Sequence, residues 1–265
     1  MQVPEYARHE IHIQPGGYTT HVTSRQGAGG KTNRVLVCYK RNALRLNGNP
    51  TLMISAGTRV SPWFSLDILL WLDMGGVCAV PLLQEATAAE LIAAGEFLIE
   101  RGYTAAGQLA ITGNTRDATL VGECLNLRPE LFAAVLPANG FMDLLRFQLF
   151  SPGDRLVGEL GNISHPEDFT RLFARSPLHN LRPIDYPPTL ISTAYDDPTV
   201  APASSYKFGA ALQAVNQSAN PILLCIDDKT GLFDQLPLSR QVADCADLLS
   251  FLIDAVGFVP EGLSK

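Results

Sequence analysis

The sequence predicts an α/β fold with a doubly wound, mainly parallel sheet that begins with an antiparallel hairpin. Short, nearly continuous apolar segments recur along the chain, and they are typical of strands buried on both faces of a parallel sheet. Helical patterns separate most of these segments, which is the alternation that parallel strands require. Two runs of alternating β-branched residues near the start predict the hairpin at one edge of the sheet.

The hairpin is expected over residues 19–25 and 34–40, and the second of these runs reads RVLVCYK. A Gly-rich segment joins them and contains GAGGKT at residues 27–32. A phosphate-binding loop would need glycine in place of Arg25 and a helix in place of the second strand. We therefore interpret this segment as a hairpin turn.

The remaining elements follow in chain order. Strands are expected at residues 50–55, 76–81, 108–112, 133–138, 188–194 and 221–227. Helices are expected at residues 63–74, 86–101, 118–127, 168–175, 202–215 and 238–255. Residues 147–166 are rich in Gly, Pro and Asp, and we expect an irregular excursion over the carboxyl ends of the strands, where α/β proteins bind ligands.

The composition is that of one globular domain over residues 1–265. The net charge of −6 and a pI near 5.3, with no basic run, argue against a nucleic-acid partner. The N-terminal segment has neither the basic nor the apolar region of a signal peptide, so a cytoplasmic location is expected. Residues 63–80 are the longest apolar stretch, and two aspartates and two glycines interrupt it, so no membrane span is predicted.

No metal or cofactor is predicted. The five cysteines have no C-x-x-C spacing, and we expect reduced, mostly buried thiols. His9 and His12 have no third ligand placed beside them, and we interpret them as surface residues.

The segment LAITGNTRDATLVGE, residues 109–123, has the pattern of a buried strand, a sharp turn and a helix. Many hydrolases carry a nucleophilic serine in such a turn within G-x-S-x-G. Here the five residues are Gly113, Asn114, Thr115, Arg116 and Asp117. The sequence therefore predicts the turn with threonine where the serine would stand.

A base for this threonine is not found in the expected place. In hydrolases of this architecture the histidine follows the last strand, but residues 227–237 contain none. The last histidine of the chain, His179, precedes the candidate acid at Asp196. A hydroxyl group without an adjacent base stays protonated near neutral pH and attacks poorly.

Six segments together resemble the catalytic domain of the prolyl oligopeptidase family of serine peptidases, over about residues 18–258. The resemblance implies an α/β-hydrolase fold and the absence of the family's N-terminal propeller domain from residues 1–265. The segments are MGGVCAV (74–80), AAGEFLIERGYTAAGQLAITG (93–113), RPELFAAVLPANGFMDLLRF (128–147), SPLHN (176–180), YPPTLISTAYDD (186–197) and PILLCIDDKTG (221–231).

The resemblance also implies that the catalytic site differs from the family's at nearly every position. It places the family's serine at Thr115, its acid at Asp196, its histidine at Leu232 and its oxyanion-binding tyrosine near Ala56. Two glycines of the turn become Asp117 and Ala118, the substrate-holding arginine falls at Pro198, and the tryptophan that stacks on the substrate's proline falls near Leu156. No intact triad is expected.

Three hypotheses follow. The leading one is a non-catalytic protein that acts through interaction, either as a homodimer or with an active relative. The second is an active hydrolase or lyase with a rebuilt site, for which the candidates are Arg59, Thr115, Arg116, Asp117 and Asp196. The third is a binder of a small molecule that the sequence does not identify. In it, Arg59 or Arg116 would hold an anion in the cleft that corresponds to the family's catalytic site. Asp196 is expected to be solvated or paired with one of these arginines.

Overall fold

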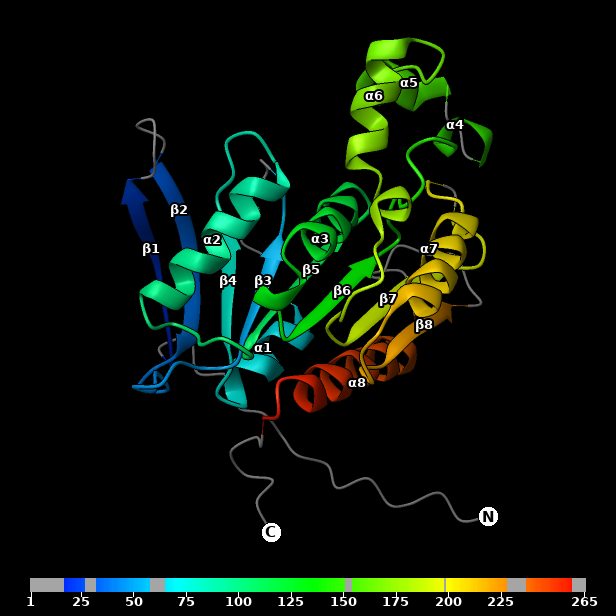
Figure 1. Ribbon diagram of the computed structural model, residues 1–265. Coiled ribbons are helices and arrows are strands. Elements are labelled where there is room, and N and C mark those ends of the chain that lie inside the picture. Colours follow the sequence, from blue (N-terminus) through cyan, green and yellow to red (C-terminus); the bar gives the residue numbers. More distant parts are fainter. Residues whose placement is uncertain are drawn as a thin grey trace, which may run out of the picture.

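The computed structural model describes residues 17–26, 32–57, 65–150, 154–197, 199–227 and 237–258. Its strands are β1 (Tyr18–Gln26), β2 (Thr32–Lys40), β3 (Thr51–Ser55), β4 (Val77–Pro81), β5 (Leu109–Asn114), β6 (Ala134–Ala138), β7 (Thr189–Ala194) and β8 (Ile222–Asp227). Within the described ranges they form one eight-stranded sheet in the order β1-β2-β4-β3-β5-β6-β7-β8 (Figure 1).

The predicted hairpin and the parallel sheet are both confirmed. β1 pairs antiparallel with β2, and β2 pairs antiparallel with β4. The pairs from β4 through β8 are all parallel. Every residue of β3 is buried, as expected for a central strand covered on both faces.

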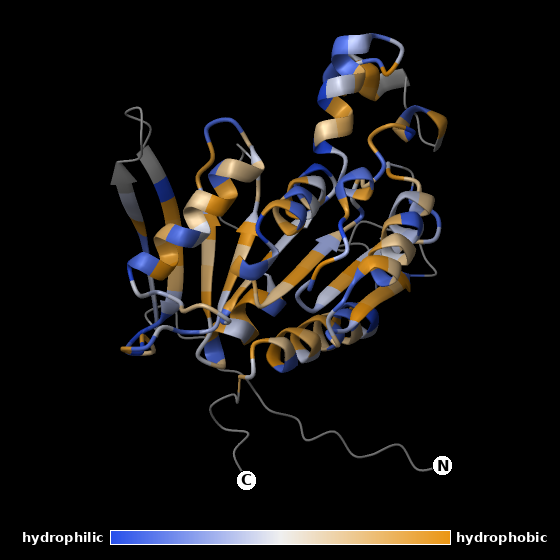
Figure 2. Ribbon diagram, viewed as in Figure 1, coloured by the Kyte–Doolittle hydropathy of each residue, from blue (hydrophilic) through white to orange (hydrophobic). Residues whose placement is uncertain are grey.

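Helices cover the two faces of the sheet, so the fold is doubly wound. One face holds α2 (Ala88–Glu100), α3 (Arg116–Leu127) and α7 (Pro202–Val215), whose apolar residues belong to a single core cluster. The other face holds α1 (Leu66–Asp73) and α8 (Leu238–Ala255), which share a second cluster. In Figure 2 the apolar residues are concentrated on the strands and on the helix sides that meet them. None of the helices in the described ranges is long and apolar enough to cross a membrane.

The excursion after β6 is more regular than expected. It contains the short helices α4 (Phe147–Phe150) and α5 (Asp154–Leu160), followed by α6 (Pro166–Arg175) and the 3-10 turn η4 (Pro177–Asn180). The prediction of irregular structure over residues 147–166 was wrong because these short helices are held by a small core of their own, built around Phe141, Leu144 and Leu172. As predicted, the excursion stands at the carboxyl ends of β5 and β6 (Figure 1).

Candidate functional site

The turn between β5 and α3 has the strained geometry predicted for residues 113–117. Thr115 has φ 56° and ψ −107°, a region that β-branched residues rarely enter. Its N–H donates to the carbonyl of Ala138 at 2.9 Å, which anchors the turn to the end of β6. α3 begins at Arg116, two residues earlier than expected, because the turn closes within a single residue.

Glycine is required at position 113 by a close approach of the backbone. A Cβ atom there would lie 2.8 Å from the carbonyl carbon of Asp117 and 2.9 Å from its oxygen. The first turn of α3 therefore packs directly on the last residues of β5. This contact fixes the place of Thr115 above the sheet.

The hydroxyl group of Thr115 has a local partner. Its Oγ1 donates to Oδ1 of Asn114 at 3.0 Å. No histidine in the described ranges hydrogen-bonds to Thr115, and Leu232, to which the resemblance assigns the base, lies outside these residues. The described surroundings therefore give this hydroxyl no group that would remove its proton.

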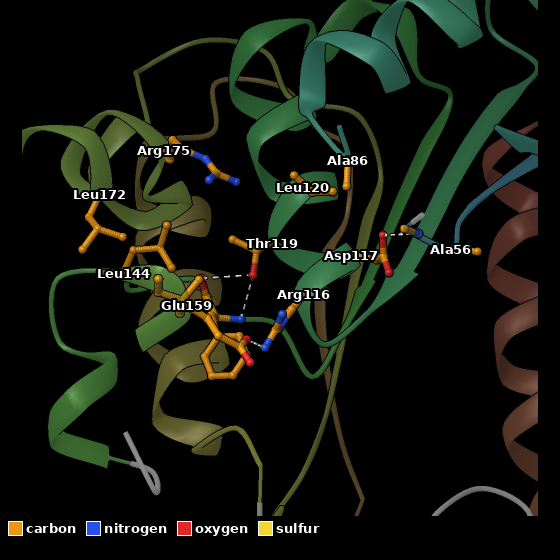
Figure 3. A pocket seen from close by; sticks show the side chains of 13 residues that line it. Ala56, Ala86, Arg116, Asp117, Thr119, Leu120, Leu144, Glu159, Leu172 and Arg175 are labelled. Carbon is orange, nitrogen blue, oxygen red and sulfur yellow. Dashed lines mark hydrogen bonds and ion pairs between the residues drawn. The ribbon is translucent and has the colours of Figure 1, made fainter. Parts of the chain in front are cut away.

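Asp117 ties the start of α3 to the loop after β3. Its Oδ1 accepts from Oγ of Ser55 at 2.5 Å. It also accepts from the backbone N–H of Gly57 at 2.8 Å, next to Ala56 (Figure 3). This loop is where the resemblance places the family's oxyanion donor. A carboxylate there occupies a backbone donor and adds negative charge where a reaction would develop more of it.

The side chain of Arg116 reaches the excursion. It forms an ion pair with Glu159 of α5, and both side chains are more than half exposed. Asp196 was expected to be solvated or to pair with Arg59 or Arg116, and Arg116 is paired with Glu159 instead. The second expected partner, Arg59, lies outside the described residues, as does Pro198.

Asp196 lies on the turn that follows β7, at the same edge of the sheet as Ala56 and Thr115. It is exposed, and it makes no hydrogen bond or ion pair within the described part of the chain. The neighbouring Asp197 instead accepts from the N–H groups of Thr199 and Val200 and shapes the turn. Its exposure fits the first of its two expected outcomes, a solvated carboxylate, while pairing with Arg59 stays a prediction.

A cavity of about 720 Å³ lies beside the turn, between α3 and the excursion (Figure 3). Its charged lining residues are Arg116, Asp117, Glu159 and Arg175. Neither Thr115 nor Asp196 lines it. Its apolar lining residues are Ala56, Ala86, Leu120, Phe141, Leu144, Leu160 and Leu172.

The charges around this cavity are largely satisfied within the protein. Arg175 donates to Glu123 at 2.9 Å, and Arg116 is paired with Glu159. Burial raises the pKa of Glu123, and Arg175 opposes that rise. The described lining residues therefore offer mixed charge and apolar surface, without an excess of positive charge among them.

Sequence reasoning missed a second group of polar residues, at the base of the excursion. His179 Nδ1 lies 2.8 Å from Ser176 Oγ, and its Nε2 lies 3.9 Å from Oδ1 of Asp143. Asp143 is buried and also pairs with Lys207. The segment SPLHN contained the only sequence signal, but its partner, 33 residues before Ser176 in the chain, was not recognisable.

This Ser/His/Asp group is structural. Ser176 is fully buried, and its Oγ accepts the N–H of Leu144 at 3.1 Å. Burial lowers the pKa of His179, and the Asp143 carboxylate partly opposes that shift. A buried serine bound to the backbone cannot reach a substrate, so the group joins the excursion to the body of the domain.

The remaining observations concern candidate metal ligands and the cysteines. The described residues contain no cluster of three or more His, Cys, Asp or Glu side chains that could hold a metal ion. Four of the five cysteines are buried, and Cys225 is exposed.

Comparisons with known proteins bear on the family and the fold of this chain. The family model described as "Prolyl oligopeptidase family" matches residues 71–257. A prolyl endopeptidase of Elizabethkingia meningoseptica is 30% identical over 275 residues, covering 95% of this chain and 39% of the relative. A dual function macrocyclase-peptidase of Galerina marginata is 35% identical over 224 residues, covering 76% of this chain and 30% of the relative.

Solved structures give the same result. A structure from an analysis of two prolyl endopeptidases superposes with a TM-score of 0.86 at 30% identity, covering 97% of this chain and 39% of that chain. Prolyl oligopeptidase B from Galerina marginata, bound to a 25mer macrocyclization substrate, gives 0.87 at 28% identity, with coverage of 94% and 38%. The chain thus spans about 39% of the length of the endopeptidase relatives.

Proposed function

Because this chain belongs to the prolyl oligopeptidase family, we propose that it is a non-catalytic member whose α/β-hydrolase-type domain acts by binding another macromolecule. The observation that carries the proposal is the threonine in the nucleophile turn. Thr115 holds the strained conformation of a nucleophile, but its hydroxyl group is bonded to Asn114. The backbone of the nucleophile turn is thus retained, while the residue at its centre differs from the family's serine.

The oxyanion side of the site supports the same proposal. Ala56 offers no side-chain donor, and the adjacent Gly57 N–H is occupied by the carboxylate of Asp117. Loss of one oxyanion donor typically costs about a hundredfold or more in rate. A negative charge in that place opposes the oxyanion further.

The scaffold itself is well formed, which supports a role in binding. Two extensive clusters of buried apolar residues fill both faces of the sheet. A folded domain with an altered site can still present its surface to a partner, since function lies in sites and surfaces and not in the fold. A homodimer and a complex with an active relative are the two proposed assemblies.

The cavity favours a second candidate function, the binding of a small molecule. Its volume lies within the range of roughly 300 to 1,000 Å³ that is usual for ligand pockets, and it combines Arg116 and Asp117 with apolar side chains. A molecule with both polar and apolar parts would fit this lining. Native mass spectrometry of the purified chain distinguishes this candidate, since a bound ligand adds its own mass.

A fluorophosphonate probe tests the leading proposal, because it labels serine or a similar nucleophile only when that group is activated. We expect no adduct on Thr115 after incubation of the intact chain, read by tryptic mass spectrometry. The prolyl endopeptidase of Elizabethkingia meningoseptica serves as the positive control. Stoichiometric labelling of Thr115 would refute the proposal, and labelling of another residue would favour a rebuilt site.

A further inference from the structure

A cluster of charged and polar side chains joins the excursion to the body of the domain. It consists of Asp143, Arg146, Ser176, His179 and Lys207, and we call it the His179 cluster. Asp143 and Arg146 follow β6, Ser176 and His179 lie at η4, and Lys207 lies in α7. Three segments that are far apart in the sequence therefore meet at this point.

Hydrogen bonds assign the proton of the neutral His179 ring to Nδ1. Ser176 Oγ donates to the carbonyl of Met142 at 3.3 Å and accepts from the N–H of Leu144 at 3.1 Å. Because the one hydroxyl proton is used in this way, Nδ1 of His179, 2.8 Å away, carries a proton and donates it to Oγ. Nε2 is then unprotonated, and it accepts from Nη1 of Arg146 at 3.4 Å.

Protonation of Nε2 would place a second cation against Arg146. The new N–H group would face the guanidinium group across 3.4 Å, so repulsion between like charges would replace a hydrogen bond. The carboxylate of Asp143 is already shared, since its Oδ2 pairs with Lys207 and lies 3.5 Å from Arg146. The cluster thus carries one net positive charge, and protonation of His179 would make it two.

Asp143 attracts an imidazolium but is poorly placed to bind its proton. Its Oδ1 lies 3.9 Å from Nε2, beyond hydrogen-bond distance, and has no hydrogen-bond partner among the described residues. The side chains of Asp143 and His179 are 2% and 19% exposed, so water solvates an imidazolium poorly here.

The balance of these influences favours the neutral ring. Burial lowers the pKa of His179, the Asp143 carboxylate opposes that shift, and the cations Arg146 and Lys207 add to it. These three are the charged groups of the described chain that act on the imidazole. The pKa of His179 in the folded cluster is therefore below its ordinary value.

We propose that His179 makes the attachment of the excursion sensitive to pH, so that protonation of its Nε2 loosens η4 and α6 and opens the cavity beside α3. To reach water, the charged ring must leave Ser176, whose Oγ ties η4 to the segment after β6. The ring of Phe173 in α6 packs on the imidazole, with the two centroids 5.9 Å apart, so α6 responds to the same movement.

Loosening of the excursion changes access to the cavity because the excursion supplies part of its wall. Glu159, Leu172 and Arg175 line the cavity from this side (Figure 3). The inference goes beyond the proposed function and does not depend on the chemistry of Thr115.

The dependence on pH has a definite sign. When the excursion loosens, His179 regains its ordinary pKa near 6.5, so the loosened state binds more protons than the attached state. Attachment is therefore strongest above about pH 6.5 and weakens as the pH falls toward the lower pKa of the attached state. Below that pKa both states are protonated, and His179 weakens the attachment no further.

NMR titration of the histidine rings tests the electrostatic part of the proposal. The chain has five histidines, and the signal that is missing in His179→Gln identifies His179. Its midpoint is expected below about 6.5, and Arg146→Gln should raise it because a neutral amide replaces the facing cation. Arg171→Gln is the matched control, since Arg171 binds Asp168 instead and should leave the midpoint unchanged. A wild-type midpoint above 6.5, or equal shifts in both arginine variants, would overturn the proposal.

Hydrogen exchange of the full chain tests the movement itself. Exchange rates of the α6 amides, each divided by the intrinsic rate at the same pH, report how often the excursion opens. Between about pH 7.5 and about pH 5.0 this ratio is expected to rise at least roughly threefold in wild type, while the amides of β5 show no such rise. His179→Gln should abolish the rise because glutamine stays neutral. His165→Gln, which removes a 70% exposed histidine from the same excursion, should keep it.

An equal rise in wild type and His179→Gln, or no rise in wild type, would overturn the proposal. If His179→Gln loosens the excursion at both pH values, Arg146→Gln decides, since that variant keeps the imidazole and removes the facing cation. Its rise should be smaller than that of wild type, and an undiminished rise would reject the proposal.

Discussion

The double variant Thr115→Ser/Leu232→His is expected to cleave a blocked proline-containing peptide with a kcat/KM at least about a hundredfold below that of an active relative. The changes supply a hydroxyl group and an imidazole where the family resemblance places them, beside Asp196. They do not supply the hydroxyl donor to the oxyanion that Ala56 lacks. Leu156 and Pro198 also leave the substrate without the partners that the resemblance assigns to those positions, so positioning is poor.

A third change separates the electrostatic part of this expectation from the rest. Asp117→Asn keeps an acceptor for Ser55 and for the Gly57 N–H, but it removes the negative charge. Added to the double variant, it should raise kcat/KM, since less negative charge then opposes the oxyanion. Steady-state hydrolysis at equal enzyme concentration measures both variants. A double variant as active as the relative would mean that the site is dormant and not dismantled.

Gly113→Ala is expected to lower the free energy of unfolding by about 3 kcal/mol, near the upper end of the usual cost of overpacking. The added methyl group would meet the backbone of Asp117 at 2.8 Å, and that backbone cannot move without shifting the start of α3. Chemical denaturation of the two proteins gives the difference directly.

Gly158→Ala is the matched control for this substitution. Gly158 lies in α5, and a Cβ atom there would meet nothing within 4 Å. Alanine is the better helix former, so this variant should be as stable as wild type or more stable by roughly 0.5 to 1 kcal/mol. Equal stability of wild type and Gly113→Ala would show that the packing at the nucleophile turn is looser than described.

Local patterns were sufficient to predict most of the elements. The limits of α7 and α8 agree with the predicted residues 202–215 and 238–255. For α7 the signal is physical, because Pro202 stands at the first helical position, where its fixed φ suits a helix start. The helices of the excursion were harder to predict from the sequence, since helices as short as α4 and α5 depend on tertiary packing more than on local propensity.

The candidate site was predictable in outline and not in its contacts. The pattern of strand, glycine and helix located the turn at Thr115, because each part of it is local in sequence. The hydrogen bond of Asp117 with Ser55 joins residues 62 apart, and the ion pair of Arg116 with Glu159 depends on where the excursion folds back. Neither follows from periodicity, so the sequence did not predict that Arg116 pairs with Glu159.

A non-catalytic Thr115 is tested most directly by the hydrolysis of a blocked proline-containing peptide by wild type and by Thr115→Ala, measured side by side. We expect the same background rate for both proteins, because Thr115 takes no part in a reaction. Alanine is a suitable replacement, since it removes the hydroxyl group and the β-branch without adding a new polar group. A wild-type activity that falls tenfold or more in Thr115→Ala, equivalent to about 1.4 kcal/mol of transition-state stabilisation, would refute the proposed function and identify Thr115 as a catalytic residue.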